Sequence, residues 1–148
     1  MSKTQKTAIT RASIAKNAIK YSFVRPFIGL GAASFPVIYE IQTNIWKGHT
    51  HNIFLELSVS YGIPSAVILF STILILILVS GKILFSYPKD QEYINLYDRA
   101  IWASIFFFLV SQLVDVQYFD GKMSTLAWIL LACLKNIIDE KELNSKIN

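Results

Sequence analysis

The sequence predicts an all-α membrane protein, and three observations support this fold class. Of its 148 residues, 53% are hydrophobic and only 16% are charged, which excludes a disordered chain. The mean hydropathy of +0.45 argues against a water-soluble globule. Residues 57–81 carry no charge, and this run of 25 exceeds the roughly 20 residues that a helix needs to cross the hydrocarbon core. We expect an amphipathic interfacial helix, an irregular external loop, a short helix and about three transmembrane helices.

The first quarter of the chain is basic and has a helical pattern. Six cations and no acid precede Glu40. Between residues 7 and 23, apolar side chains recur every three or four positions, while Arg11, Lys16 and Lys20 occupy other positions. This pattern predicts a basic helix lying on a membrane surface. It also fits a helix that packs on its own protein and keeps a solvated charged face.

Residues 26–51 are predicted to form an irregular loop. Pro26 ends the preceding helix, because a proline disfavours helical geometry in the residue before it, and Gly29, Gly31 and Pro36 follow. The Gly-x-Gly sequence lacks the third glycine of a dinucleotide fingerprint and does not follow a buried strand, so nucleotide binding is rejected. We expect no cofactor and no nucleic-acid partner.

Local signals place the remaining helices. Asn52 is a candidate N-cap for a short helix over residues 53–61, with Gly62 as its terminator and Pro64 in the first turn of the next helix. Residues 1–62 would then form an external region and residues 63–138 the membrane region. Within that region we expect spans at about 63–80, 100–115 and 123–138, a polar connection at 81–99, and finally a charged tail at 139–148.

Three spans would place the two termini on opposite sides of the membrane. The connection at 81–99 carries three cations, and Lys135, Lys141 and Lys146 lie near or after the end of the last span, against one cation in the hairpin tip. The positive-inside rule therefore places the connection and the tail in the cytoplasm. The total count of eight external against six internal cations leaves the topology open. An anionic partner outside would explain the basic amino-terminal region.

Two histidines lie where the loop enters the short helix. His49 and His51 just precede Asn52, and two ionisable imidazoles at a membrane interface suggest a functional site, although structural hydrogen bonding is the alternative. No third ligand with suitable spacing accompanies the pair, since the nearest carboxylate, Glu56, is a turn further along the helix. We therefore predict no metal site here, and the single Cys133 cannot supply one either.

At these residues the sequence resembles the bacterial O-antigen ligases and O-antigen polymerases, which are polytopic membrane glycosyltransferases. The shared signature is His, then Asn, Ser or Asp, two free positions, Leu, six free positions and Gly. This chain carries it complete, from His51 and Asn52 through Leu55 to Gly62. Residues 25–31 also resemble the family's Arg-Pro-x-x-Gly-x-Gly stretch.

The resemblance covers residues from about 10 to 138. Arg11 falls where many members carry an arginine, and Asp115 stands at the outer end of a hairpin, as in the family. Ser65 stands where a second glycine is common. Family members have many more spans, and only their carboxyl-terminal part is represented here. The resemblance thus implies a polypeptide partner that supplies the missing spans, as well as contact with membrane lipids.

The resemblance implies transfer of a glycan from an undecaprenyl-pyrophosphate carrier to an acceptor sugar hydroxyl, in lipopolysaccharide or surface polysaccharide biosynthesis at the bacterial inner membrane. His51 would be the catalytic base, because an imidazole with a pKa near about 6.5 accepts a proton at neutral pH. Arg25 and Arg11 would bind the pyrophosphate through two-pronged hydrogen bonds. The other implied substrate-binding residues are Asn52, His49, Gly29 and Gly31. Glu56 and Asp115 would not touch the substrate but would position the residues that do.

Two spatial expectations follow from this assignment. The imidazole of His51 and the guanidinium of Arg25 should converge on one pocket at the outer membrane surface. The start of the short helix at Asn52 should present unpaired N–H groups toward the loop.

Other function classes remain open. One alternative is a catalytically inactive membrane module or assembly subunit. Another is a transporter-like protein, which is disfavoured because the chain shows no inverted repeat and no charged pair deep in a span. The sequence does not distinguish a ligase from a polymerase or identify the sugars.

Overall fold

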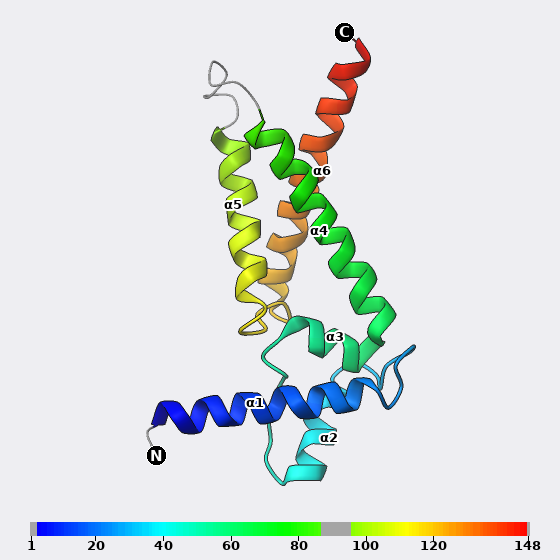
Figure 1. Ribbon diagram of the computed structural model, residues 1–148, viewed down its shortest axis with the longest axis vertical. Coiled ribbons are helices and arrows are strands. Elements are labelled where there is room, and N and C mark those ends of the chain that lie inside the picture. Colours follow the sequence, from blue (N-terminus) through cyan, green and yellow to red (C-terminus); the bar gives the residue numbers. More distant parts are fainter. Residues whose placement is uncertain (1–2, 87–95, 148) are drawn as a thin grey trace. The chain divides into compact units, whose positions relative to one another are not determined.

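The structure, a computed structural model, describes residues 3–86 and 96–147 (Figure 1). These residues form six helices and no strand, which confirms the all-α prediction. In chain order the helices are α1 (Lys3–Ser22), α2 (Ser34–Thr43), α3 (Ile53–Tyr61), α4 (Ile63–Phe85), α5 (Leu96–Ser111) and α6 (Gly121–Ile147). The chain divides into a first unit, Met1–Phe70 with Ser111–Val116, and a second unit, Ser71–Val110 with Gln117–Asn148.

The first unit has its core among α1, α2 and α3. Phe35 of α2 stacks on Tyr39, with ring centroids 5.4 Å apart, and meets Tyr21 of α1 at 6.1 Å. These aromatic contacts bury large side chains and contribute beyond the area they remove from water. The buried core residues are Ile14, Ala18, Tyr21, Phe35, Tyr39 and Val59.

Helix α1 buries a different face from the one that the sequence pattern predicted. Ile14, Ala18 and Tyr21 are buried against the rest of the unit. Ile19 belongs to the predicted apolar stripe and is 49% exposed, and Phe23, directly after the helix, is 68% exposed. The helix therefore packs on its own protein through one face and leaves a second apolar face uncovered in the structure.

The expectation of an irregular loop over residues 26–51 is wrong in the middle, where α2 lies. Pro36 occupies the first turn of α2, where its missing N–H would have no helical partner in any case. The helix is bounded by Ala33 and Asn44, both left-handed, with φ of 56° and 55°. The N-cap residue makes no side-chain bond and neither boundary is a glycine, so apart from Pro36 the sequence carries no strong mark of a helix here.

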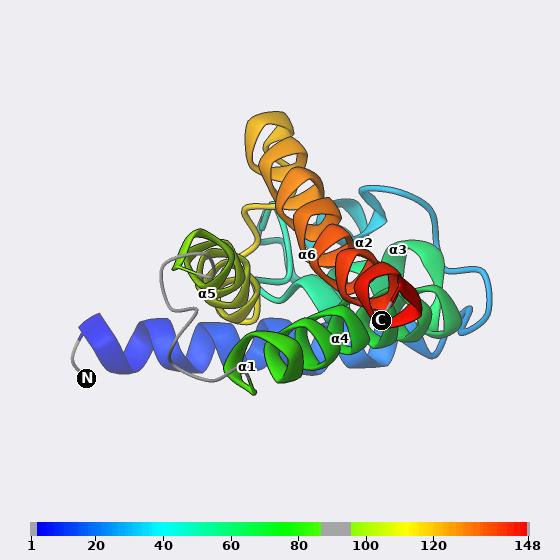
Figure 2. The ribbon, with the colours of Figure 1, turned by 90° about the horizontal axis from the view of Figure 1, so that it is seen from above.

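The segment between α1 and α2 turns back along α3 (Figure 2). The N–H groups of Leu30 and Gly31 donate to the carbonyls of Val59 and Ser60 at 2.8 and 3.0 Å. Gly29 has a φ of +70°, and a Cβ there would lie 2.4 Å from the carbonyl carbon and oxygen of Ser60. Only glycine allows this close approach of two backbones.

Helix α3 begins and ends where the local signals predicted. Asn52 is the N-cap, and its Oδ1 accepts the N–H of Leu55 at 3.1 Å, a cap that contributes about 1 kcal/mol. Gly62 is the C-cap with a φ of 91°. The next helix, α4, begins at Ile63 with Pro64 in its first turn, as predicted.

The second unit packs part of α4 with α5 and α6 around aliphatic side chains. Trp102 of α5 adds a polar link, since its Nε1 donates to the carbonyl of Ile77 at 2.9 Å. The indole also stacks on Phe106, with ring centroids 5.2 Å apart. The buried core residues are Ile77, Leu84, Ile105, Ala127, Leu131, Leu134 and Ile137.

By length and composition, two helices could cross a membrane: α4 and the portion Gly121–Glu140 of α6. The described part of helix α5 has 16 residues, fewer than the roughly 20 that a full span needs. Its first described residue and its last residue each lie four positions before the corresponding ends of the predicted span at 100–115. The middle of the predicted connection at 81–99, residues 87–95, lies outside the described residues.

The segment predicted as a charged tail, residues 139–148, is largely helical, because α6 continues to Ile147. Side-chain pairs four residues apart support this extension. The ammonium of Lys135 pairs with Asp139, and the amide of Asn136 donates to Glu140 at 2.7 Å. The described charged side chains of this segment, Asp139, Glu140 and Glu142, thus lie on a helix surface.

Candidate functional site

His49, His51 and Asp115 come together at the start of α3, and we call them the histidine–aspartate cluster. Nδ1 of His51 lies 3.2 Å from Oδ1 of Asp115, across a sequence separation of 64 residues. The His49 ring meets the His51 ring edge-on, with centroids 4.4 Å apart. One potential ligand atom from each of the three side chains lies within 4.8 Å of the others. The cluster therefore brings a third polar group to the histidine pair.

Asn52 attaches the segment that carries Asp115 to the start of α3. While its Oδ1 caps the helix, its Nδ2 donates to the carbonyl of Leu113 at 3.1 Å. The N–H of Ile53 donates to the carbonyl of Gln112 at 3.0 Å. Two bonds from consecutive residues thus hold the segment that follows α5, and this places the carboxylate beside the imidazole.

The buried carboxylate of Glu56 fixes the loop that carries the two histidines, residues 49–51, which we call the histidine loop. Its side chain is 2% exposed, and Oε2 accepts the N–H of Thr50 at 2.8 Å. The hydroxyl of Thr50 in turn donates to the carbonyl of Asn52 at 2.8 Å. Burial raises the pKa of Glu56 above its usual 4.5, while the hydrogen bonds from Thr50 act in the opposite direction. Glu56 is therefore a support of the loop and does not reach the cluster directly.

His51 has an unusual backbone conformation. Its φ of 59° lies in the left-handed region, which costs a non-glycine residue about 1 kcal/mol or more. The surrounding bonds hold it there: its N–H donates to Nδ1 of His49 at 3.2 Å, and its ring meets Asp115. Such strain, maintained by several contacts, is found most often at functional sites.

The cluster contains a neutral imidazole and an ionised carboxylate at neutral pH. Burial lowers the pKa of His49 below its usual 6.5, and the neighbouring His51 lowers it further, against the opposing effect of Asp115. The hydrogen bond from His51 lowers the pKa of Asp115 below its usual 3.8. Asp115 is 53% exposed and His51 30% exposed at their side chains, so both are accessible from outside.

The N–H groups around the start of α3 are paired within the chain. Residues 50–53 donate, in order, to a carboxylate, an imidazole, a hydroxyl and a backbone carbonyl. The expectation of unpaired N–H groups facing a ligand is therefore wrong for these four residues. The groups that the site presents to a ligand are instead the imidazoles and the carboxylate of the histidine–aspartate cluster, which carry lone pairs.

Arg25 and Arg11 stand apart from the cluster. Both are exposed, and within residues 3–86 and 96–147 no hydrogen bond or ion pair joins either guanidinium to it. The carbonyl of Pro26 accepts the N–H of Ile63 at 2.7 Å, so Arg25 lies by the carboxyl end of α3, whereas His51 precedes the amino end. Nine helical residues separate these ends by about 13 Å. The expected convergence of the two groups is not seen.

The two loop glycines differ in what they do. Gly29 allows the close approach of the loop to the backbone of α3. Gly31 has a φ of +105°, and a Cβ at this position would meet open space, so only its backbone conformation favours glycine. Both lie with Arg25 at the carboxyl end of α3, away from the cluster.

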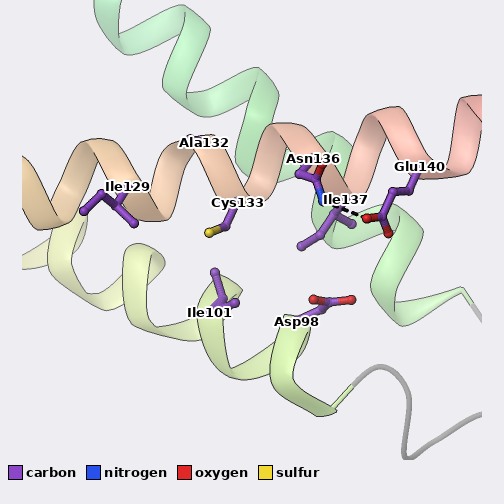
Figure 3. Close-up of a pocket in the computed structure, with 8 residues that line it drawn as sticks. All are labelled: Asp98, Ile101, Ile129, Ala132, Cys133, Asn136, Ile137 and Glu140. Atoms are coloured by element: carbon purple, nitrogen blue, oxygen red, sulfur yellow. Dashed lines mark hydrogen bonds between the residues drawn. The ribbon is translucent and has the colours of Figure 1, made fainter.

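Two hollows lie elsewhere. A cleft of about 480 Å³ between α5 and α6 is lined by apolar side chains, the thiol of Cys133, the amide of Asn136 and the carboxylates of Asp98 and Glu140 (Figure 3). Its lining residues include neither an imidazole nor a cation. An apolar groove of about 220 Å³ in the first unit lies along α1 and α3, lined by Ile19, Ser22, Phe23, Phe54, Leu55, Ser58 and Ile63.

Sequence reasoning missed two contributors to the site. Thr50 lies between the two histidines, and its hydroxyl, which bonds the backbone of Asn52, was a usable signal. The carbonyls of Gln112 and Leu113 carry no such signal, because any residue supplies a carbonyl. In comparisons with family models, curated proteins and solved structures, the chain has no match.

Proposed function

We propose that this chain is a membrane glycosyltransferase of the O-antigen ligase or polymerase type, acting whole or as the carboxyl-terminal part of a larger assembly. It would transfer a glycan from an undecaprenyl-pyrophosphate carrier to an acceptor sugar hydroxyl. The observation that carries the proposal is the 3.2 Å contact between Nδ1 of His51 and Oδ1 of Asp115. It is the arrangement that a histidine base needs.

The carboxylate of Asp115 selects the useful tautomer of His51. A proton on Nδ1 can donate to the carboxylate, so this tautomer is favoured and Nε2 keeps its lone pair. Nε2 can then take the proton from an attacking hydroxyl. The imidazolium that forms is stabilised by the adjacent negative charge. His51 is the proposed catalytic base and Asp115 its positioning residue.

The signature residues each have a structural task, which supports the resemblance. Asn52 caps α3 and holds the 112–115 segment. Leu55 packs against the first unit's core. Gly62 has a positive φ, and a Cβ there would lie 2.5 Å from the carbonyl oxygen of Phe27.

Arg25 and Arg11 remain the proposed cations for the donor pyrophosphate. Both guanidinium groups are exposed, and among the described residues neither is engaged by a carboxylate. To act together with His51, the Arg25 side chain would have to extend along α3 when the donor binds. A guanidinium placed there would stabilise the charge that develops on the leaving group.

We also propose three spans, with the first unit at the outer surface of the inner membrane and the carboxyl terminus in the cytoplasm. The length and composition of α4 and of Gly121–Glu140 support two of them. Helix α5 would be the third, with Arg99 reaching toward the interface. Exposed apolar side chains next to Lys20 and Arg25 suit an interfacial position of the first unit, namely Phe23, Val24, Phe27 and Ile28.

Glycan transfer can be measured in membranes that contain the full chain, the lipid-linked donor and an acceptor, with the product resolved by gel mobility. His51→Asn removes the base but keeps a residue that tolerates the left-handed conformation. We expect transfer to fall at least about 100-fold, the usual contribution of a general base.

A matched pair of carboxylates provides the control. Asp115→Asn should lower transfer about 10- to 100-fold, because the imidazole loses its orienting partner. Asp120 is exposed and caps α6 through its Oδ1, a task that asparagine can perform, so Asp120→Asn should leave transfer unchanged. Wild-type transfer by His51→Asn would reject the assignment of the base. A correctly inserted wild-type chain without transfer would favour the inactive membrane module.

A further inference from the structure

The histidine–aspartate cluster has the composition of a cation site. It offers two imidazoles and one carboxylate, while the neighbouring N–H groups of residues 50–53 are already paired. No described hydrogen bond or ion pair brings a lysine or arginine to it. We propose that His49, His51 and Asp115 bind one divalent transition-metal ion of the Zn²⁺ class.

The spacing of the ligand atoms fits such an ion. Two ligands bound at about 2.0–2.1 Å in tetrahedral geometry lie about 3.3 Å apart. Nδ1 of His51 and Oδ1 of Asp115 are 3.2 Å apart, so an ion can replace the proton between them with little movement. The His49 ligand atom lies within 4.8 Å of the other two, and side-chain rotation closes the remaining distance.

The ligand types favour some ions over others. Imidazole nitrogens suit Zn²⁺, Cu²⁺ and Ni²⁺, whereas Mg²⁺ and Ca²⁺ prefer oxygen ligands. A ligand imidazole must be unprotonated, so the ion competes with protons for the two histidines. Three protein ligands leave a fourth position for water or a hydroxyl group.

Two of the ligands are held in place by hydrogen bonds that do not involve a metal. Asn52 holds the segment that carries Asp115, and Glu56 holds the loop that carries His51 through Thr50. Binding therefore requires little ordering of the backbone. Metal binding costs the hydrogen bond from the N–H of His51 to Nδ1 of His49. This bond is lost whichever His49 nitrogen binds the ion, because Nδ1 then carries either the ion or the ring proton. The bond is long, at 3.2 Å.

Metal binding has a consequence that rests on the proposed function. An ion on Nδ1 of His51 leaves the ring proton on Nε2, and the imidazole can then no longer accept a proton from a hydroxyl. Zn²⁺ should therefore inhibit transfer. His49→Ala should relieve this inhibition, because it weakens the metal site without removing the proposed base.

The binding test uses the purified full chain in detergent micelles, without a histidine tag and without donor or acceptor. Every protein carries Cys133→Ala, so that the free thiol cannot bind the probe. Zn²⁺ is titrated by calorimetry, and Co²⁺ is followed by its visible absorption. We expect one equivalent to bind, with Mg²⁺ in excess failing to compete.

The variants decide where the ion binds. His49→Ala and Asp115→Asn should each weaken Zn²⁺ binding at least about tenfold, and Asp120→Asn should match the wild type. Circular dichroism confirms that each variant is folded. The absence of Zn²⁺ binding by the wild type, or a Zn²⁺ affinity equal to that of the wild type in either ligand variant, would overturn the proposal. Because this test needs no transfer, a failure of the metal site and a failure of the proposed function are read separately.

Discussion

The two units of the chain differ in where they bury polar groups. Among the described residues, seven polar or charged side chains are buried, and six of them lie in the first unit. The exception is Ser80, whose hydroxyl donates to a carbonyl of its own helix. The buried residues of the first unit include Thr50 and Glu56, which bond across the loop. The second unit is held mainly by aliphatic packing.

This difference predicts different responses to substitution. A hydrogen bond between two distant segments depends on the placement of both backbones, and an unpaired buried group costs its full desolvation energy. Aliphatic helix packing adapts more readily, since neighbouring side chains can change rotamer. We expect the first unit to be sensitive to small changes in geometry and the second unit to tolerate them.

The largest expected effect is that of Gly29→Ala in the first unit. The new Cβ would lie 2.4 Å from the backbone of Ser60, and alanine disfavours the φ of +70°. Because no side chain can move to make room, the loop must detach from α3, at a cost of about 3 kcal/mol or more. Chemical unfolding in detergent micelles measures the loss.

Two glycines of the second unit complete this comparison. In Gly81→Ala the nearest atom is Nε1 of Trp102 at 3.0 Å, which belongs to a side chain and not to the backbone, so we expect a loss of about 1–2 kcal/mol, smaller than that of Gly29→Ala. Gly121→Ala meets open space and should change stability by less than about 0.5 kcal/mol. If Gly81→Ala were as harmful as Gly29→Ala, the second unit would not be the more tolerant one.

The parts of the fold that the sequence predicted are those with local signals. Asn52, Gly62 and Pro64 mark the ends of α3 and the start of α4 through their own backbone preferences, and the structure confirms those boundaries. Helix α2 was missed because its ends are left-handed residues without glycine, Ala33 and Asn44. A helix bounded in this way is stabilised by its packing, which a linear pattern does not reveal.

The candidate site was predictable only in part, for the same reason. The histidines are adjacent in the sequence, but Asp115 is 64 residues from His51, and periodicity does not indicate that contact. Their meeting depends on bonds to the carbonyls of Gln112 and Leu113, which have no sequence signature. Sequence spacing alone therefore did not indicate that Asp115 joins the histidine pair.

A smaller effect is expected from Glu56→Ala, which tests whether the buried carboxylate holds the histidine loop. The substitution leaves the N–H of Thr50 without its partner in a site where Thr50 is 3% exposed. We expect a loss of about 2 kcal/mol. Glu56→Gln keeps an acceptor for this N–H and should cost less, so the difference between the two variants measures the bond.

The pH dependence of the unfolding free energy provides a second test of the role of Glu56. The pKa of Glu56 is raised above its usual 4.5, so the folded state binds the proton more tightly than the unfolded state. The stability contributed by this group is present in full below pH 4.5 and is lost as the pH rises through the raised pKa. Glutamine does not titrate, and Glu56→Gln should therefore gain on the wild type in unfolding free energy as the pH rises. A constant difference between about pH 4 and about pH 7 would contradict this assignment.

An effect smaller than that of Glu56→Ala is expected from Trp102→Phe, which probes the polar link of the second unit. Phenylalanine keeps a ring that can stack on Phe106 and meet Phe85 edge-on, but it loses the bond from Nε1 to the carbonyl of Ile77. We expect a loss of about 1 kcal/mol, the net value of one hydrogen bond. In the control Trp128→Phe, the lost bond joins Nε1 to the hydroxyl of Tyr118 at an exposed position, where water can replace it, and stability should hardly change. Should Trp102→Phe prove more harmful than Glu56→Ala, a single polar contact would hold the second unit as firmly as the buried network holds the first, and the contrast between aliphatic packing and polar placement would fail.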